Sequence, residues 1–268
     1  MPQNVSNAEL RSLVEWWDAM GVPTDATELR RVLESAAEAT ETPQTSEPPQ
    51  PKPARAIKSN AIADRVSEAA QLAAASDTLQ ALKAAIESFD GCPLKTLCER
   101  TVVFDGTEGA PVMVIGEGPG GQEDRLGLPF VGKAGQLLDK MLAAIALDRK
   151  QNAFITNVNY WRPPGNRNPE ADELAVCRPF VDRMIDLGTP KLILVMGGVA
   201  AKTLLNTQTG IMKLRGSEHV YQTPSGTSVP LIPLFHPAYL LRRPQDKAKT
   251  WQDLLLAKAR LNAMGISL

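Results

Sequence analysis

The sequence is poor in cysteine and contains no long apolar run. Its 268 residues include three cysteines, an odd number that cannot make a complete disulfide framework and that suits a reducing cytoplasm. No apolar segment approaches the roughly 20 residues that a membrane span needs. Charged residues interrupt the N-terminal stretch at Glu9, Arg11, Glu15 and Asp18, so we expect no secretory signal. We therefore expect a cytoplasmic protein that does not bind membranes.

A phosphate-binding loop is also missing. Residues 116–124 (GEGPGGQED) form a glycine-rich segment, but no GK[ST] follows it. Pro119 interrupts the GxGxxG spacing that dinucleotide-binding folds use. A nucleotide-binding regulator is therefore the least favoured of the functions that this segment suggests.

The net charge of −1 hides an asymmetry between the two parts of the chain. Residues 1–90 hold 8 Lys and Arg against 14 Asp and Glu, a net charge of −6. Residues 91–268 hold 21 against 16, a net charge of +5. The basic part could meet a polyanion such as DNA, although a chance imbalance on a solvated surface would look the same. Charge alone therefore decides nothing.

Two stretches before residue 59 differ from the rest of the chain. Residues 1–35 carry apolar side chains at helical spacing and predict a short amphipathic helix, the side chains being Leu10, Leu13, Val14, Trp17 and Met20. Residues 36–58 are rich in Pro, Ala and Glu and have no large hydrophobe before Ile57, so we expect a disordered linker. The helix either docks a protein partner or is an inert appendage. Residues 59–268 are assigned to one α/β domain.

From residue 111 onward, short apolar runs alternate with helical patterns. The runs are almost continuously apolar, as in strands buried on both faces, and cover Val112–Ile115, Ala153–Val158, Leu192–Met196 and Leu231–Phe235. Helical patterns cover about 60–88, 133–147, 170–187, 198–206 and 247–263. This predicts a three-layer α/β/α fold with a central, mainly parallel four-stranded sheet, after a helical and partly disordered N-terminal extension. Ligands of such folds bind at the carboxyl ends of strands, so we expect functional residues in the loops there.

Four motifs follow one another in this region. They are GEGPGGQEDRLGLPFVGKAGQLLDKML from residue 116, ITN at Ile155–Asn157, RPPGNRNP at Arg162–Pro169 and HPAYLLR at His236–Arg242. In this order they resemble the uracil-DNA glycosylase superfamily, in particular its family 4 enzymes, over residues 76–264. The resemblance implies a hydrolase of base-excision DNA repair. Such an enzyme flips uracil out of DNA and lets water attack the glycosidic bond, leaving free uracil and an abasic site without a lyase step.

Three side chains are expected to hold and activate the base. Phe130 can stack on a pyrimidine face, although a phenylalanine taken alone is more often a core residue. The amide of Asn157 carries a donor and an acceptor that match the O4 and N3–H of uracil, and family 4 enzymes use the matching asparagine in this way. His236, one of two histidines, can donate a hydrogen bond to uracil O2 as negative charge develops there.

The first glycine-rich loop supplies the remaining candidates. The resemblance points to Glu117 as the residue that positions or activates water near the sugar C1′. Gly118 lets the backbone approach the base closely. Glu123 is expected to orient the pocket rather than to react.

DNA contacts are expected around the last motif. In this superfamily an apolar side chain from that loop wedges into the gap left by the flipped base, and we select Leu240 over its neighbour Leu241. Arg242, Arg162 and Arg167 are expected to meet phosphates, although each could be only a surface charge. The sequence leaves open whether the partner is single-stranded or double-stranded uracil-containing DNA.

The resemblance breaks at the metal site. Family 4 enzymes usually bind a 4Fe-4S cluster through four cysteines, and the corresponding positions here are Phe89, Cys92, Trp161 and Cys177. Cys98 is out of register with these positions. We therefore expect no cluster and no metal, with Phe89 and Trp161 filling the space by apolar packing.

Two further expectations concern the outcome of the reaction. A branch of the superfamily traps the sugar covalently with a histidine, and Asn166 stands about where that histidine would fall, so we expect turnover instead. We also expect a monomer. A weakly catalytic or non-catalytic protein that binds uracil or abasic sites is the alternative function, and the joint presence of Glu117, Phe130, Asn157 and His236 argues against it.

Overall fold

Four apolar segments form the parallel centre of a sheet in the computed structural model, which describes residues 57–266. The strands are β2 (Val112–Gly116), β3 (Ala153–Asn157), β4 (Leu192–Met196) and β6 (Ser228–Leu234). They run parallel in the order β3-β2-β4-β6. Every residue of β2, β3 and β4 is buried, as expected for strands covered on both faces. These are the four strands that the sequence predicts.

Two short edge strands that the sequence analysis does not predict complete a six-stranded sheet. β1 (Phe104–Gly106) pairs antiparallel with β3, and β5 (His219–Gln222) pairs antiparallel with β6. β1 has only three residues, and in β5 only Tyr221 is buried. Neither strand therefore carries the continuous apolar run that identifies the four central ones.

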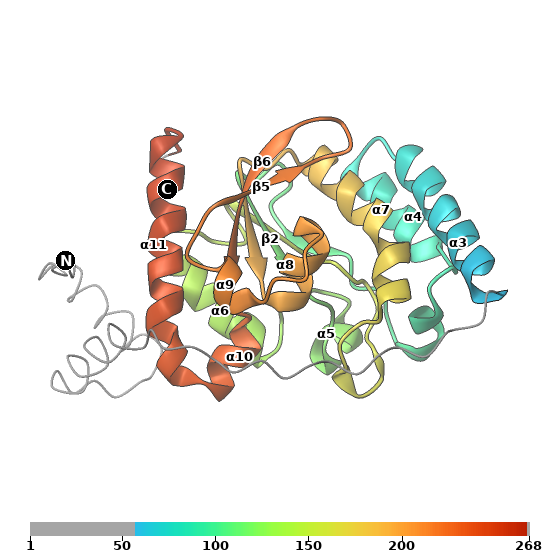
Figure 1. Ribbon diagram of the computed structural model, residues 1–268, viewed down its shortest axis with the longest axis horizontal. Coiled ribbons are helices and arrows are strands. Elements are labelled where there is room, and N and C mark those ends of the chain that lie inside the picture. Colours follow the sequence, from blue (N-terminus) through green and yellow to red (C-terminus); the bar gives the residue numbers. More distant parts are fainter. Residues whose placement is uncertain (1–56, 267–268) are drawn as a thin grey trace, which may run out of the picture. The chain divides into compact units, whose positions relative to one another are not determined.

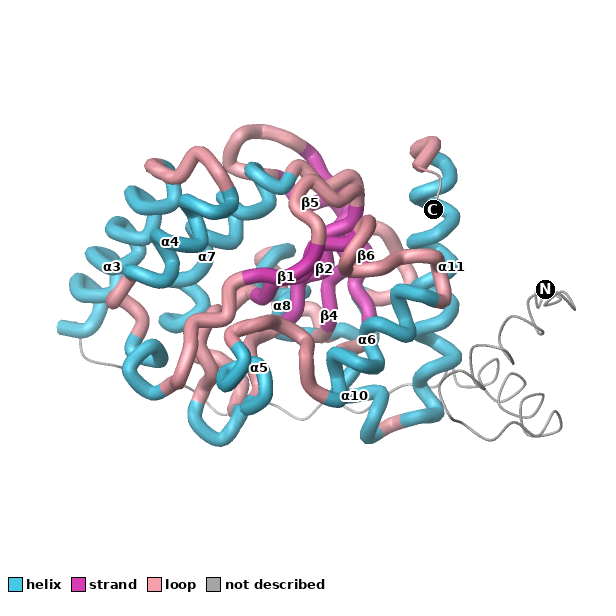
Figure 2. Tube along the Cα trace, turned by 180° about the vertical axis from the view of Figure 1, so that it is seen from behind, coloured by secondary structure: helices cyan, strands magenta, loops and turns pink. Residues whose placement is uncertain are grey.

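Helices cover both faces of the sheet, as Figures 1 and 2 show from opposite sides. The helices on one face are α3 (Ile57–Ala74), α4 (Leu79–Ser88), α7 (Ala171–Gly188) and α8 (Gly198–Leu205), and those on the other are α6 (Lys133–Ala143) and α11 (Lys247–Ala263). Met113 and Ile115 of β2 belong to the same buried cluster as Ile86 of α4 and Phe180 of α7. The expected three-layer α/β/α architecture is confirmed.

The predicted helical stretch 60–88 is two helices separated by a turn. The hydroxyl of Thr78 accepts a hydrogen bond from the backbone N–H of Ala81 at 3.1 Å and so caps the start of α4. The guanidinium of Arg183 in α7 donates to the carbonyl of Ser76 in this turn at 3.0 and 2.8 Å. The turn is thereby fixed to the helix that packs beside it.

Three short helices lie near the carboxyl ends of the parallel strands. They are α5 (Gly121–Leu126), α9 (Ile211–Leu214) and α10 (Pro237–Arg242). α5 and α10 follow the loops after β2 and β6, and both lie at the same end of the sheet in Figure 1. This end holds the motifs on which the family resemblance rests.

The expected helix in residues 1–35 and most of the expected linker 36–58 lie outside the described residues. α3 begins at Ile57, two residues before the expected domain start at residue 59. Among the helices between residues 57 and 266, none combines the length and the apolar character needed to cross a membrane.

Candidate active site

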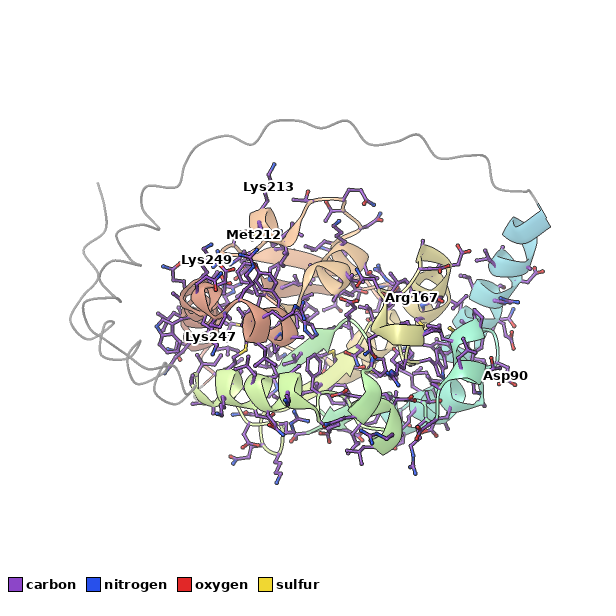
Figure 3. The ribbon with its side chains drawn as sticks, turned by 90° about the horizontal axis from the view of Figure 1, so that it is seen from below. Asp90, Arg167, Met212, Lys213, Lys247 and Lys249 are labelled. Atoms are coloured by element: carbon purple, nitrogen blue, oxygen red, sulfur yellow. The ribbon has the colours of Figure 1, made fainter. Side chains whose placement is uncertain are left out.

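Loops from three strand ends line one cavity of about 400 Å³. The lining comes from residues 117–134 after β2, 157–169 at the end of β3 and 236–242 after β6. Most of the site residues expected from the sequence meet there: Glu117, Gly118, Glu123, Phe130, Asn157, Arg167, His236 and Arg242. Arg162 and Leu240 are not among the lining residues. Figure 3 looks onto this end of the domain and labels Arg167 in the loop before α7.

Phe130 forms one wall of the cavity in a strained backbone conformation. Its φ of 53° lies in the left-handed region, which costs a non-glycine residue about 1–2 kcal/mol. Its ring is stacked on the imidazole of His236, with 5.6 Å between ring centroids and 29° between planes. A Cβ on Gly135 would lie 1.8 Å from the Phe130 carbonyl oxygen, and one on Gly116 would lie 2.4 Å from Cζ of the ring. Both glycines are therefore needed for the ring to occupy this place.

Glu123 fixes the segment that follows Phe130. One carboxylate oxygen, Oε1, accepts hydrogen bonds from the backbone N–H groups of Val131 at 3.0 Å and Gly132 at 2.8 Å. Gly132 is the residue before α6, where a negative charge is also favoured by the helix dipole. This geometry suits the pocket-orienting role expected for Glu123.

Asn157 presents a buried amide to the cavity. It is the last residue of β3, pairs in register with Gly116 of β2 and is 1% exposed. Within the described part of the chain, its Oδ1 has no hydrogen-bond partner. A buried polar atom without a partner costs about 1–3 kcal/mol. The site is therefore arranged for a donor that comes from outside the protein.

His236 has one defined tautomer. It stands before α10, and its Nδ1 accepts a hydrogen bond from the backbone N–H of Ala238 at 3.1 Å. A neutral imidazole that accepts at Nδ1 carries its proton on Nε2. Burial, and then the positive charge of Arg242, lower the pKa of His236 from 6.5 to about 4. At neutral pH the side chain is an uncharged donor.

Glu117 directly follows β2 and lines the same cavity. Its side chain is partly buried, and burial raises the pKa of its carboxyl group above the ordinary value. The backbone N–H of Asn159 donates to the Glu117 carbonyl at 3.1 Å. A Cβ on Gly118 would lie 3.2 Å from Nδ2 of Asn159, so glycine allows close packing of this loop.

The expected phosphate contacts differ in their surroundings. Both terminal nitrogens of Arg167 bind the carboxylate of Glu173, at 2.8 and 2.6 Å. Nε of Arg162 donates to Oδ1 of Asn166 at 2.8 Å, and its Nη1 lies 3.7 Å from Asp124. Side chains of the protein itself therefore already bind these two guanidinium groups, and the sequence does not reveal these contacts. Arg242 is exposed at the edge of the cavity.

The choice of Leu240 as the wedge is corrected by the structure. Leu240 is 0% exposed, because it lies on the face of α10 that packs into the core. Leu241 is 46% exposed. A side chain that enters DNA must reach solvent first, so Leu241 is the leucine of this pair that is available.

Sequence reasoning also missed part of the lining. Tyr239 of α10 and Asn168 of the loop after β3 contribute to the cavity, together with Ala134 at the start of α6. Both loops belong to motifs that the sequence contains, so membership of a motif is the feature of the sequence that points to these residues. Which residues of a motif face inward depends on helix phase and loop shape, which the motif alone does not give.

The residues at the family's cluster positions do not fit a four-cysteine cluster. The chain has three cysteines, and such a cluster normally needs four ligands. Phe89 and Trp161 are 1% and 0% exposed, with 6.3 Å between their ring centroids. Phe180 packs edge-on against Phe89 at 5.2 Å. Among the residues that the structure describes, no group of three His, Cys, Asp or Glu side chains could hold a metal ion.

Comparison with known proteins gives a consistent set of relatives. Residues 104–255 match the family model described as the Uracil DNA glycosylase superfamily. A Type-4 uracil-DNA glycosylase from Sulfurisphaera tokodaii is 37% identical over 172 residues, which are 63% of this chain and 78% of the relative. The Type-4 enzyme from Pyrobaculum aerophilum is 36% identical over 66% of this chain and 92% of its own length. The one from Thermotoga maritima is 33% identical over 67% and 93%.

Proposed function

This chain belongs to the uracil DNA glycosylase superfamily, and on that premise we propose that it is a DNA-repair enzyme that releases uracil from DNA. The reaction is hydrolysis of the N-glycosidic bond, which gives free uracil and an abasic site. Relatives named as Type-4 uracil-DNA glycosylases support the activity. The convergence of Glu117, Asn157 and His236 on one cavity supports the assignment of this activity to that site.

The observation that carries the proposal is the unpartnered amide oxygen of Asn157 beside the Phe130 ring. Uracil offers an N3–H donor to Oδ1 and an O4 acceptor to the amide nitrogen. Cytosine has no proton at N3, so it would leave the buried oxygen unpaired at a cost of about 1–3 kcal/mol. The site therefore favours uracil over the base from which it arises by deamination.

We propose that uracil leaves the base stack to reach this cavity. The groups that would read its edges lie on the floor and walls of the cavity, where a stacked base could not meet them. The exposed Leu241 is placed to fill the gap left in the DNA, and the exposed Arg242 to contact a phosphate.

Bond cleavage follows from two opposite charges that develop in the transition state. Negative charge grows on uracil O2, where Nε2–H of the neutral His236 can donate a hydrogen bond without first taking up a proton. Positive charge grows on the sugar, where the carboxylate of Glu117 offsets it and orients water toward C1′. Water adds its hydroxyl group to C1′ and gives up its other proton. Uracil leaves with the electrons of the glycosidic bond and later takes up that proton.

We propose that the enzyme is monofunctional and turns over. Among the described residues that line the cavity there is no lysine to form a Schiff base with the sugar. Asn166 lines the cavity, but its Oδ1 accepts a hydrogen bond from Arg162, and an amide is a poor nucleophile. We also propose that no iron–sulfur cluster is bound, because aromatic side chains take up the space of two ligands.

The test is uracil release from oligonucleotides that carry one uracil opposite guanine, opposite adenine or unpaired. We expect release by the wild-type protein and a loss of about a hundredfold or more in Glu117→Gln, because the amide neither attracts the proton of water nor offsets the sugar charge. Glu108→Gln is the matched control, since Glu108 is exposed in the turn before the amino end of β2. A wild-type protein that binds these oligonucleotides and releases nothing would establish the alternative, a uracil or abasic-site binding protein.

A further inference from the structure

A side chain outside the cavity forms hydrogen bonds to the backbone at Phe130. Arg149 comes from the turn between α6 and β3, and its side chain is 13% exposed. Its Nη2 donates to the carbonyl of Phe130 at 2.9 Å, and its Nη1 donates to the carbonyl of Pro129 at 3.3 Å. Arg149 does not line the cavity, and nothing in its local sequence singles it out.

Two carboxylates hold the guanidinium group in place. Nη1 lies 2.9 Å from Oδ2 of Asp105 in β1, and Nη2 lies 2.7 Å from Oδ1 of Asp139 in α6. Nε also donates to Asp139 at 2.8 Å. Only a planar group with several donors can satisfy two carboxylates and two carbonyls together, and a lysine ammonium has three donors on a flexible stem. The group is therefore a rigid link among β1, α6 and the Phe130 segment.

The segment that Arg149 grips needs such support. Phe130 has a φ of 53°, a conformation that is unfavourable without outside contacts. Glu123 binds the two N–H groups after Phe130, and Arg149 binds the two carbonyls at and before it. The carboxylate and the guanidinium thus fix consecutive peptide groups on both sides of one residue. The ring on that residue is the one stacked against His236.

We propose that Arg149 is a positioning residue that holds the Phe130 ring at the distance and tilt needed to stack on the base. It acts through the main chain and touches neither the base nor the sugar. This inference rests on the proposed glycosylase function. If Arg149 positions the ring in this way, loss of its hydrogen bonds to the two carbonyls slows uracil release, even though every group that lines the cavity is still present.

The experiment is a double-mutant cycle of Arg149→Lys with Phe130→Leu, measured as the single-turnover rate of uracil release. Arg149→Lys keeps a positive charge between Asp105 and Asp139 but cannot bind both carbonyls. We expect it to slow release about tenfold in the wild-type background and less than twofold in the Phe130→Leu background, because the ring it positions is then absent.

Arg183→Lys is the matched control. Its guanidinium also binds a backbone carbonyl, that of Ser76, in a turn that contributes nothing to the cavity. We expect this variant to release uracil at the wild-type rate in both backgrounds. Melting temperatures of all variants separate a loss of folded protein from a loss of rate.

A second variant tests the inference if Arg149→Lys does not fold. Asp139 is half exposed, and among residues 57–266 its carboxylate binds only the guanidinium of Arg149, so Asp139→Asn loosens Arg149 while leaving its bonds to the carbonyls. We expect a smaller loss of rate that again disappears with Phe130→Leu. Equal slowing in both backgrounds, or no slowing in either, would overturn the inference. Absence of uracil release by the wild-type protein would instead overturn the proposed function.

Discussion

A single backbone N–H sets the chemical state of His236. The hydrogen bond from Ala238 occupies Nδ1, so the proton stays on Nε2. Burial and Arg242 oppose a second proton and lower the pKa to about 4. A donor that is already neutral avoids the cost of placing a cation beside Arg242 in a buried site.

The lowered pKa predicts how stability depends on pH. Between pH 6.5 and about 4 the unfolded chain takes up a proton on His236 that the folded protein does not, so acidification favours unfolding. We expect the melting temperature to fall as pH drops through this window, and to fall less in His236→Asn. Asparagine can still accept the Ala238 N–H as a helix cap, so the variant removes the titration and keeps the bond.

Thermal melts at pH 7.5 and pH 5 compare the two proteins. A change of melting temperature that is the same in wild type and His236→Asn would show that His236 titrates normally in the folded state. Glu117 titrates in both proteins, so its raised pKa cancels in the comparison.

At the residue scale, the sequence predicts the residues that line the cavity better than the residues that hold them in place. Asn157 and His236 are predictable because each ends or follows a buried strand within a motif. The role of Arg149 depends on its contact with Asp105, which is 44 residues away in the sequence. No local sequence pattern predicts such a contact. The choice between Leu240 and Leu241 depends on the phase of α10, and a one-residue difference moves a side chain from the core to solvent.

Among the elements, the segment before β1 and the loop after β3 are joined by aromatic packing. Trp161 lies in the loop and contacts Phe89, and its indole N–H donates to the hydroxyl of Thr101 at 3.1 Å. Cys92 and Cys177 lie in the same buried cluster. Apolar contacts therefore make the connection that a metal cluster could otherwise make between these segments.

This packing predicts a stability cost and an absence of iron. Trp161→Ala should lower the free energy of unfolding by about 3–5 kcal/mol, because it leaves a large cavity in the core. Urea denaturation measures this cost, and Leu97→Ala, at a position 63% exposed, should change stability by less than about 0.5 kcal/mol. The purified wild-type protein should show no absorbance band near 400 nm. About four iron atoms per chain would contradict the proposal that no cluster is bound.

The elements that the sequence predicts are those with a strong periodic or continuous apolar signal. β2, β3 and β4 are buried throughout, and each is found within two residues of its expected ends. β5 is not predicted, because its four residues alternate in exposure and their sequence pattern cannot be distinguished from that of a loop. α10 is missed because its six residues begin with proline and are too few to show a helical period.

For the whole chain, the family match and every cavity residue fall within one unit. Contacts within the chain separate residues 58–268 from residues 1–57. The match covers residues 104–255. We propose that the first segment takes no part in catalysis, whether it docks a protein partner or is an inert appendage, and that the rest acts as a monomer.

Removal of residues 1–56 tests this division. We expect the shortened protein to release uracil with a kcat/KM within about twofold of the full chain, because no cavity residue is lost and the deleted part is acidic and would not attract DNA. The comparison uses the same oligonucleotides at one salt concentration. A tenfold or larger loss would place part of the DNA-binding surface in the first segment.

The walls of the cavity come from segments that lie far apart along the chain, after β2, β3 and β6. Glu117 leaves the ribosome long before His236, which follows the last of the parallel strands. A nascent or prematurely terminated chain that ends before β6 therefore contains Glu117 and Asn157 but lacks His236. Under the proposed function, we expect such a chain to release no uracil, because the imidazole proposed to stabilise the leaving base is not yet present.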